Sequence, residues 1–148
     1  RCGNIIEGKI MTEYNKIYAR ADSTGKVVKI FSEAFEHPLD TDILIDGTNI
    51  DRHGAQRYPV TDNDGFYNYA IQDGALVLRD KTADKAIAQN AILISELKAK
   101  LSATDYKALK YMEGYISEED YAPIKAERQA MRDKINEYET QIMMLSNN

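Results

Sequence analysis

The hydrophobic pattern of this 148-residue chain changes period near residue 81. Before that point, apolar residues alternate with polar ones or form short runs between turn residues, as in β-strands. After it, apolar residues recur every three or four positions, as in α-helices. The pattern predicts an α+β fold with a β-rich domain at 13–80 and a helical domain at 81–148. For residues 1–12 we expect a loosely ordered leader or an expression remnant.

The first half predicts an antiparallel β meander of about five or six strands with short connections. The expected strands are 16–22, 26–31, 42–45, 57–60, 66–71 and 75–79. Turn residues separate them, among them Gly25 in "STG" and the Asp, Asn and Gly residues of "TDNDG". Pro59 would then lie near a sheet edge, where its missing N–H breaks no ladder hydrogen bond.

The second half predicts a helical hairpin of two long helices with a short helix between them. Thr82 can begin the first helix, and Gly114 can end the short helix by adopting the left-handed conformation. Pro123 fits the first turn of the last helix. Two pairs have the spacing of a capping box: Ser102 with Asp105, and Ser117 with Asp120.

Both long helices carry a stripe with a period of about 3.5 residues, the spacing of coiled coils. The stripe consists of Ala83, Ile87, Asn90, Ile94, Leu97 and Leu101 on the first helix and of Ile124, Arg128, Met131, Ile135, Tyr138, Ile142 and Leu145 on the last. Its polar members, Asn90 and Arg128, can fix register and oligomer number at a cost in stability. The stripes can pack only within one hairpin, or they can also pair with other copies. In the second case we predict a homo-oligomer, specifically a trimer with Asn90 in its seam.

Composition narrows the range of partners. The net charge of −5 argues against general affinity for nucleic acid, because phosphate binding needs clustered Lys and Arg. Apolar runs are too short for a membrane helix, and the N-terminal residues lack the apolar region of a secretory signal. Cys2 is the only cysteine, so an intramolecular disulfide is impossible. We therefore predict neither nucleic acid nor membrane as a partner.

No pattern of catalytic or metal-binding residues is found. His37 and His53 lack converging ligands at a metal-site spacing. The acidic segments 40–47 and 61–65 have turn chemistry rather than the ligand spacing of a calcium loop. The glycine patterns of phosphate and dinucleotide loops are missing. We predict a protein without catalytic residues, metal or cofactor.

Most of the ten Tyr and three Phe residues precede residue 81. They can pack across strands, or they can form a contact surface, since Tyr combines contact area with a polar group. In segment 66–71, alternation places Phe66 and Asn68 on one face, which we expect to be the wetter one. Together with Tyr58 these residues are our candidate contact surface.

Two blocks in the β-rich half, "FSEAFEHPLDTDILIDG" and "RYPVTDNDGFYNYAIQDGALVLRD", resemble small tail-associated proteins of bacteriophages and prophages of Gram-positive bacteria. The helical block "LKAKLSATDYKALKYMEGYISEEDYAPIKAERQAMRDKINEYE" is similar to the helical end of the same group. Met131 stands where that group usually has Trp, a swap that packing tolerates. The resemblance covers roughly residues 13–139.

The resemblance implies a virion tail component, a receptor-binding module or an assembly factor, and it implies no catalytic residue. We expect a non-enzymatic protein that contacts a tail-fibre or baseplate protein, located in the virion tail or in the host cytoplasm during assembly. One alternative is a tail-fibre assembly chaperone that is absent from the finished particle. The order of a β-rich half followed by a helical half is loosely similar to the order in such chaperones. Another is a small phage inhibitor of a host defence enzyme.

Overall fold

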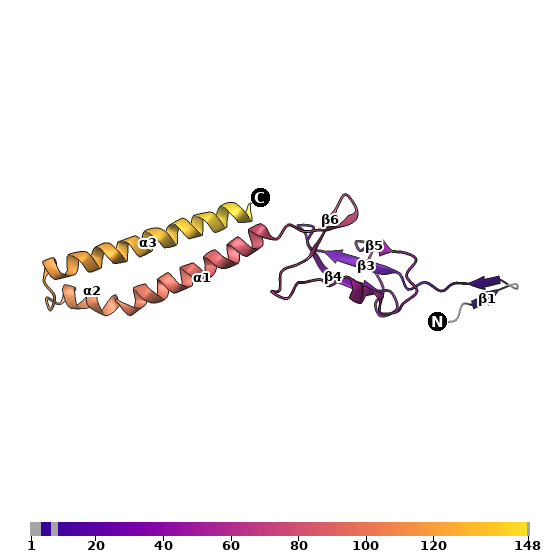
Figure 1. Cartoon of the computed structure of the whole chain (residues 1–148), viewed down its shortest axis with the longest axis horizontal. Helices are drawn as coiled ribbons and strands as arrows, with labels where there is room; N and C mark the ends of the chain where they lie inside the picture. Colours follow the sequence, from indigo (N-terminus) through magenta and orange to yellow (C-terminus); the bar gives the residue numbers. More distant parts are fainter. Residues whose placement is uncertain (1–3, 7–8, 148) are drawn as a thin grey trace. The chain divides into compact units, whose positions relative to one another are not determined.

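The computed structural model describes residues 4–6 and 9–147. The chain divides into two compact units, Arg1–Lys81 and Thr82–Asn148. The first unit contains β-strands and the second contains helices (Figure 1), so the predicted α+β class is confirmed.

The centre of the β unit is a three-stranded antiparallel sheet with the strand order β4-β3-β5. Its strands are β3 (Ile17–Ala21), β4 (Val27–Ser32) and β5 (Ile43–Asp46). A turn containing Gly25, at φ 87°, joins β3 to β4 as predicted. The order differs from a simple meander, because β5 pairs with β3 instead of β4. Asp42, just before β5, is bound by Arg20 of β3, and this contact holds the start of β5 beside β3.

A second hairpin consists of β6 (Tyr69–Gln72) and β7 (Ala75–Leu78). Its two turn residues, Asp73 and Gly74, both have positive φ, as tight hairpin turns require. The hairpin is attached to the turn between β3 and β4, where the Ile71 N–H donates to the Gly25 carbonyl at 2.8 Å.

The prediction of a strand at 57–60 is wrong. The short 3-10 helix η1 (Gly54–Arg57) lies here, followed by irregular chain. Pro59 has no N–H for a ladder, and its carbonyl accepts a hydrogen bond from the Asn68 side chain at 2.8 Å. The Val60 carbonyl also accepts the Asn68 backbone N–H at 2.9 Å, so the segment is joined to residue 68 without forming a strand.

Residues at the N-terminus form the strands β1 (Asn4–Ile6) and β2 (Lys9–Met11), which pair in antiparallel register. A loosely ordered segment was expected here. The β-branched Ile5 and Ile10 are register partners, and such residues favour strands. The same expectation for residues 1–3 and 7–8 lies outside the described residues.

The core of the β unit is small and partly polar. Its buried apolar residues are Ile17, Ala19, Val27 and Phe31, and its buried polar residues are Asn15, Ser32, Asp42 and Asn49. Every buried side-chain polar atom among the described residues has a hydrogen-bond partner. The polar groups therefore do not carry the penalty of unpaired burial.

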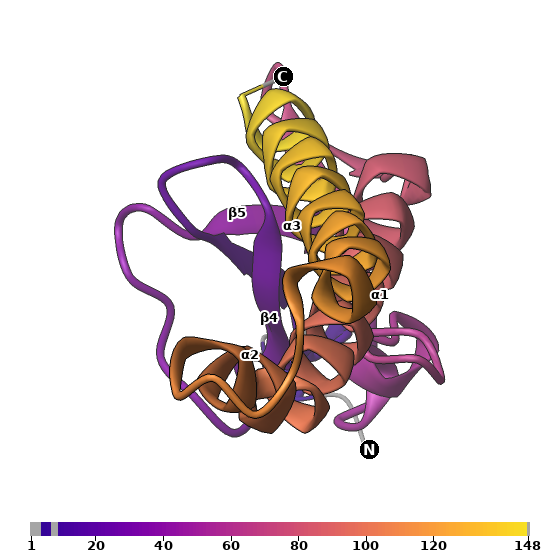
Figure 2. The same ribbon diagram turned by 90° about the vertical axis from the view of Figure 1, so that its left-hand side faces the viewer.

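The helical unit is the predicted hairpin with a short helix between two long ones. Its helices are α1 (Thr82–Ala103), α2 (Asp105–Met112) and α3 (Glu118–Ser146). Figures 1 and 2 show α3 returning alongside α1. In the part of the chain that is described, no helix is both long and apolar enough to cross a membrane.

Two predicted helix ends are confirmed. The Ser117 hydroxyl accepts from the Asp120 N–H at 3.1 Å and caps α3. Gly114, at φ 82°, ends α2 with the paired hydrogen bonds of a Schellman motif.

Two other predicted end signals are wrong. Ser102 lies inside α1, and Thr104 instead separates α1 from α2. Pro123 lies in the second turn of α3 rather than the first, because the Ser117 cap begins the helix earlier.

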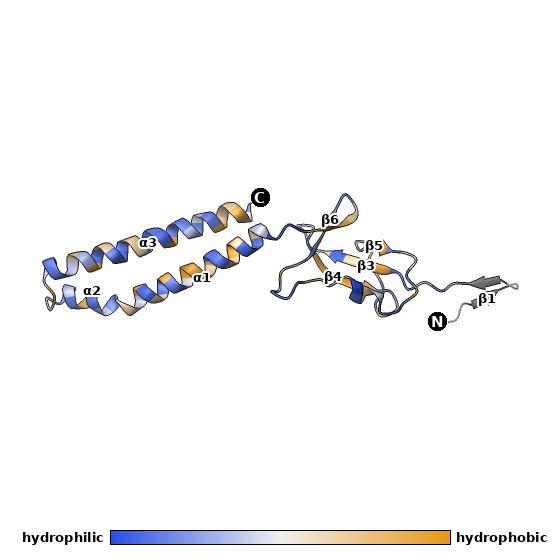
Figure 3. Cartoon of the chain, in the orientation of Figure 1, coloured by the Kyte–Doolittle hydropathy of each residue, from blue (hydrophilic) through white to orange (hydrophobic). Residues whose placement is uncertain are grey.

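The stripe that the sequence predicts lies between α1 and α3. Each of its members is buried or half-buried, and Ile94 and Ile135 are the buried apolar ones. Figure 3 shows apolar residues recurring along both long helices between hydrophilic stretches. The hairpin is therefore held by one narrow seam, with most other positions facing outward.

Candidate functional site

An apolar groove of about 370 Å³ lies between the end of β4 and η1. We refer to it as the Phe35 groove. Its lining residues are Ile30, Phe31, Ser32, Phe35, Arg52, His53, Ala55 and Gln56. All belong to the β unit, so the groove is complete within that unit.

A tight turn after β4 holds Phe35 in place. The buried Ser32 accepts the N–H of Phe35 on its carbonyl at 3.0 Å and the N–H of Ala34 on its hydroxyl at 3.2 Å. The Phe35 side chain nevertheless remains exposed, at 59% of its residue surface. A large aromatic residue is thus presented to solvent from a fixed backbone.

Two polar side chains lie close to the Phe35 ring. The His53 ring lies with its centroid 5.2 Å away at an interplanar angle of 36°. The Arg52 guanidinium carbon lies 5.1 Å from the Phe35 centroid, a cation–π distance. Arg52 makes no ion pair within the described segments, so its guanidinium can receive a carboxylate from outside.

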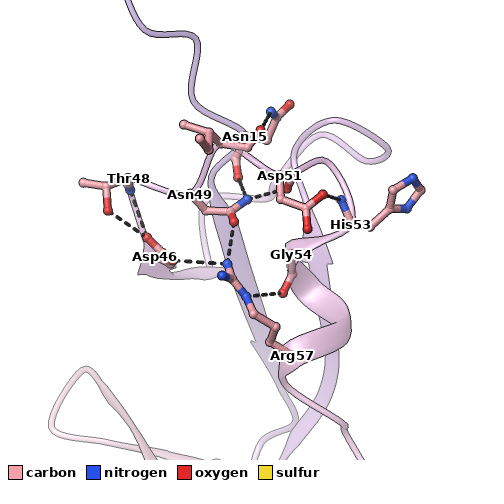
Figure 4. A network of polar contacts seen from close by, with 9 residues as sticks. Asn15, Asp46, Thr48, Asn49, Asp51, His53, Gly54 and Arg57 are labelled. Atoms are coloured by element: carbon pink, nitrogen blue, oxygen red, sulfur yellow. Dashed lines mark hydrogen bonds and ion pairs between the residues drawn. The ribbon is translucent and has the colours of Figure 1, made fainter. Parts of the chain in front are cut away.

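A buried network around Asn49 fixes the loop that carries Arg52 and His53 (Figure 4). The Asn49 amide donates to the carbonyls of Asn15 and Asp51, each at 2.6 Å. Its side-chain oxygen accepts from Arg57, whose Nε–H donates to the Gly54 carbonyl at 3.3 Å. One side chain therefore ties together the start of the sheet, the loop and η1.

Gly54 is required at its position by close approach. A Cβ there would lie 2.3 Å from the Asn49 side-chain oxygen, a distance that real Cβ atoms do not adopt. The Asp51 carboxylate accepts the His53 backbone N–H at 2.9 Å, and the His53 ring points away from the network (Figure 4). The wall of the groove is therefore preorganised by the backbone beneath it.

An ion cluster anchors the loop that follows β4. Arg20 binds the Asp42 carboxylate at 2.8 and 2.7 Å and Glu36 at 3.0 Å, while Lys29 also contacts Glu36. The hydrogen bonds from Arg20 lower the pKa of Asp42, and those from Lys29 and then Arg20 lower the pKa of Glu36. Both carboxylates are thus stabilised as anions and act as anchors for the loop.

The residues of the contact surface predicted from the sequence do not line the Phe35 groove. Tyr58, Phe66 and Asn68 are each half-buried. The Tyr58 ring lies edge-on to Tyr69 at 6.5 Å. Asn68 donates to the Pro59 carbonyl and accepts from Lys81 at 2.9 Å, so both ends of its amide are engaged. A contact role for this set stays a prediction.

The Phe35 groove was missed by sequence reasoning. Its residues come from two segments, near 30–35 and 52–56, that no local pattern connects. The only local signal is the charged turn "DRHG", which predicts a loop but does not indicate that Phe35 lies beside it.

The polar members of the helical seam are satisfied within one chain. Asn90 donates to Gln141 at 3.1 Å. Arg128 donates to the Leu101 carbonyl at 2.8 Å and to Asp105 at 2.7 Å. These contacts set the register of α1 against α3 inside the hairpin. Pairing of the seam with other copies, and the trimer through Asn90, stay predictions.

The acidic turn at 61–65 is held together by Asp62. Its carboxylate accepts the N–H groups of Asp64 at 3.0 Å and Phe66 at 2.9 Å, and it binds Lys81 at 2.5 Å. The hydrogen bond from Lys81 contributes most to lowering the pKa of Asp62. Within the described residues, no group of three or more His, Cys, Asp or Glu side chains is arranged to hold a metal ion.

Comparison of the chain with protein-family models, with curated proteins and with solved structures finds no match. Function is therefore inferred from the geometry of the Phe35 groove together with the sequence motifs.

Proposed function

We propose that this chain is a non-enzymatic protein-contact module of a bacteriophage or prophage tail, and that its Phe35 groove binds a tail-fibre or baseplate protein. The observation that carries the proposal is the exposed Phe35 ring, which contacts Arg52 and His53 in an apolar groove. The class of partner follows from the resemblance of the sequence blocks to tail-associated proteins.

The groove has the composition of an interface centre. Aromatic and Arg side chains dominate the binding energy of protein–protein contacts, especially beside well-packed pockets. Covering the exposed part of Phe35 would contribute about 1 to 2 kcal/mol. Because the Asn49 network already fixes the loop, little conformational entropy is lost on binding.

The chemistry of the groove defines the partner segment. An aliphatic or aromatic side chain suits its apolar floor of Ile30 and Phe31, and an adjacent carboxylate suits Arg52. We therefore expect the bound segment to combine an apolar anchor with a nearby Asp or Glu.

Binding to the tail protein tests the groove. The intact chain would be used to capture partners from phage-infected cells, and the affinity for the captured protein would be measured for variants. We expect Phe35→Ala and Arg52→Ala each to weaken binding about tenfold or more. Leu39→Ala is the matched control, since Leu39 is equally exposed in the same loop but does not line the groove. Equal affinity for all variants would exclude the groove as the binding site.

Mass spectrometry of purified virions tests the location. Detection of the chain in the finished particle supports a tail component, and its absence supports the assembly-chaperone alternative. Capture of a host nuclease instead of a tail protein would favour the inhibitor alternative.

A further inference from the structure

We propose that the partner of the Phe35 groove binds as a short extended segment, which adds a strand to the sheet along the free edge of β4. This inference rests on the proposed function and specifies how the partner is held. The sheet has the order β4-β3-β5, so β4 is an edge strand (Figure 1). An edge strand presents backbone donors and acceptors with which an extended peptide can pair.

The register of β3 and β4 determines which backbone groups of β4 face outward. The Glu33 N–H donates to the Lys16 carbonyl at 2.9 Å, and in an antiparallel pair every second residue exchanges hydrogen bonds with its partner. Phe31, two residues before Glu33, therefore bonds to β3. Ile30 lies opposite Ala19 at a position without these bonds, so its N–H and C=O point away from β3.

The backbone N–H and C=O of Ile30 have no hydrogen-bond partner among the described residues. At the start of β4, the hairpin of β6 and β7 occupies the edge, where the Ile71 N–H donates to the Gly25 carbonyl at 2.8 Å. At the end of β4, the Ser32 carbonyl accepts the Phe35 N–H at 3.0 Å. The open part of the edge is therefore short and lies around Ile30.

The Phe35 groove follows this open part of the edge. Ile30 and Phe31 both line the groove, although neighbouring residues of a strand point to opposite faces of the sheet. A groove that touches both residues therefore passes around the edge of β4 instead of lying on one face. A segment bound in the groove can thus reach the unpaired backbone groups of Ile30.

The same edge is protected against unselective pairing. The register passes from Lys29 with Arg20 to Val27 with Ala21, so Val28 is an extra residue that forms a β-bulge. Bulges and exposed lysines keep edge strands from pairing with other edges, and Lys29 is exposed. A long strand therefore cannot pair along β4, and the occupant is a short segment whose side chains fit the groove.

The spacing of Phe35 and Arg52 defines the side chains of the added segment. Alternate residues of a strand point to the same side and lie roughly 7 Å apart. The Arg52 guanidinium carbon lies 5.1 Å from the Phe35 ring centroid, which is close to that spacing. We therefore expect an apolar residue beside Phe35 and an Asp or Glu two positions away, paired with Arg52.

Peptides selected on the intact chain test this mode of binding. The probe is a displayed library of random short peptides, selected for binding to the wild-type chain and depleted on Phe35→Ala. If Phe35→Ala fails to fold, Arg52→Ala takes its place in the depletion step. We expect the selected peptides to share an apolar residue with an Asp or Glu two positions away.

A backbone N-methyl scan of a selected peptide tests the added strand directly, because each methyl group replaces the hydrogen of one N–H. Loss of the hydrogen bond to the Ile30 carbonyl should weaken binding about tenfold or more at one position. At the two neighbouring positions the loss should be less than about threefold, since adjacent N–H groups of a strand point to opposite sides.

Amide hydrogen exchange of the wild-type chain gives a second readout. The Ile30 N–H should exchange about tenfold or more slowly when a selected peptide is saturating. The Leu44 N–H is the matched control and should not change. Leu44 lies on the opposite edge strand, β5, and its register partner Tyr18 bonds to β4, so its N–H also points away from β3.

The outcomes separate this inference from the proposed function. If no selected peptide depends on Phe35, both the groove and the added strand are overturned. If Phe35-dependent peptides bind but the N-methyl scan shows no single sensitive position, or the exchange of Ile30 is unchanged, only the added strand is overturned. The groove then remains the binding site, and its partner is held by side-chain contacts alone.

Discussion

The β unit and the helical unit are held together in different ways. In the β unit, the buried polar side chains of Asn49 and Asp42 each bond both to a neighbour in the sequence and to a distant partner, Asn15 for Asn49 and Arg20 for Asp42. In the helical unit, similar apolar contacts repeat along one seam, and polar side chains interrupt it at Asn90 and Arg128. The first unit depends on individual groups, whereas the second spreads its stability over repeated contacts.

This difference matters for function. The Phe35 groove is assembled from segments that only the polar network brings together, so its shape depends on residues that do not line it. The seam depends on helix geometry, so its stripe is retained as long as α1 and α3 form. We therefore expect single substitutions to disturb the groove at long range and the seam only locally.

The largest effect is expected from Ile17→Ala at the centre of the β-sheet. Ile17 is fully buried, and truncating such a residue removes packing and leaves a cavity, at a cost of about 3 kcal/mol. Urea unfolding followed by NMR signals of β3 and β4 would measure it. Val28→Ala is the control, because Val28 is exposed on the edge strand β4, and it should cost about 0.5 kcal/mol or less. Equal losses would show that the β unit has no tight core.

A smaller effect is expected from Asp42→Asn, and it should depend on pH. The Asp42 side chain is fully buried against Arg20, so at pH 6 the loss should be about 2 kcal/mol. Because folding lowers the pKa of Asp42, its contribution is complete above the ordinary value near 3.9 and is lost as the pH falls through the lower folded value. Thermal midpoints of wild type and variant should therefore converge at low pH. Exposed Asp40→Asn serves as control, and a gap that stays constant down to pH 2 would contradict the prediction.

In the helical unit, Arg128→Met should cost about 1 to 2 kcal/mol. The substitution keeps an apolar stem but leaves the Leu101 carbonyl and Thr104 hydroxyl without their guanidinium partner. Denaturation followed by circular dichroism at 222 nm would measure the loss. Arg132→Met, at an exposed position four residues later, should change the free energy of unfolding by less than about 0.5 kcal/mol.

The smallest effect is expected from Asn90→Leu, and its sign is opposite. Gln141 is exposed and can bond to water instead, while Leu adds apolar burial to the seam, so we expect a gain of about 1 kcal/mol. The same denaturation experiment would show the gain, and Gln89→Leu at the exposed neighbouring position is the comparison. A loss of stability would mean that the Asn90–Gln141 bond holds the hairpin as well as setting its register.

The seam and the helix caps show which features can be predicted from residues close together in the sequence. The positions that the period of about 3.5 picks out are buried or half-buried in the hairpin, because a helix places residues three and four apart on one side. Ser117 and Gly114 were likewise predictable, since capping depends on a few neighbouring residues. Pro123 was misplaced because the earlier Ser117 cap determined where the helix begins.

What the amino-acid sequence determined by itself was therefore the α+β class, the change of period near residue 81, the paired seam and most turns. These follow from interactions between residues close together in the chain. Only the tertiary structure decided that β5 pairs with β3, that 57–60 is not a strand and that Phe35 meets Arg52 and His53. The reason is that Arg20–Asp42 and the Asn49 network join distant segments, and the strength of such bonds depends on burial that no local pattern records.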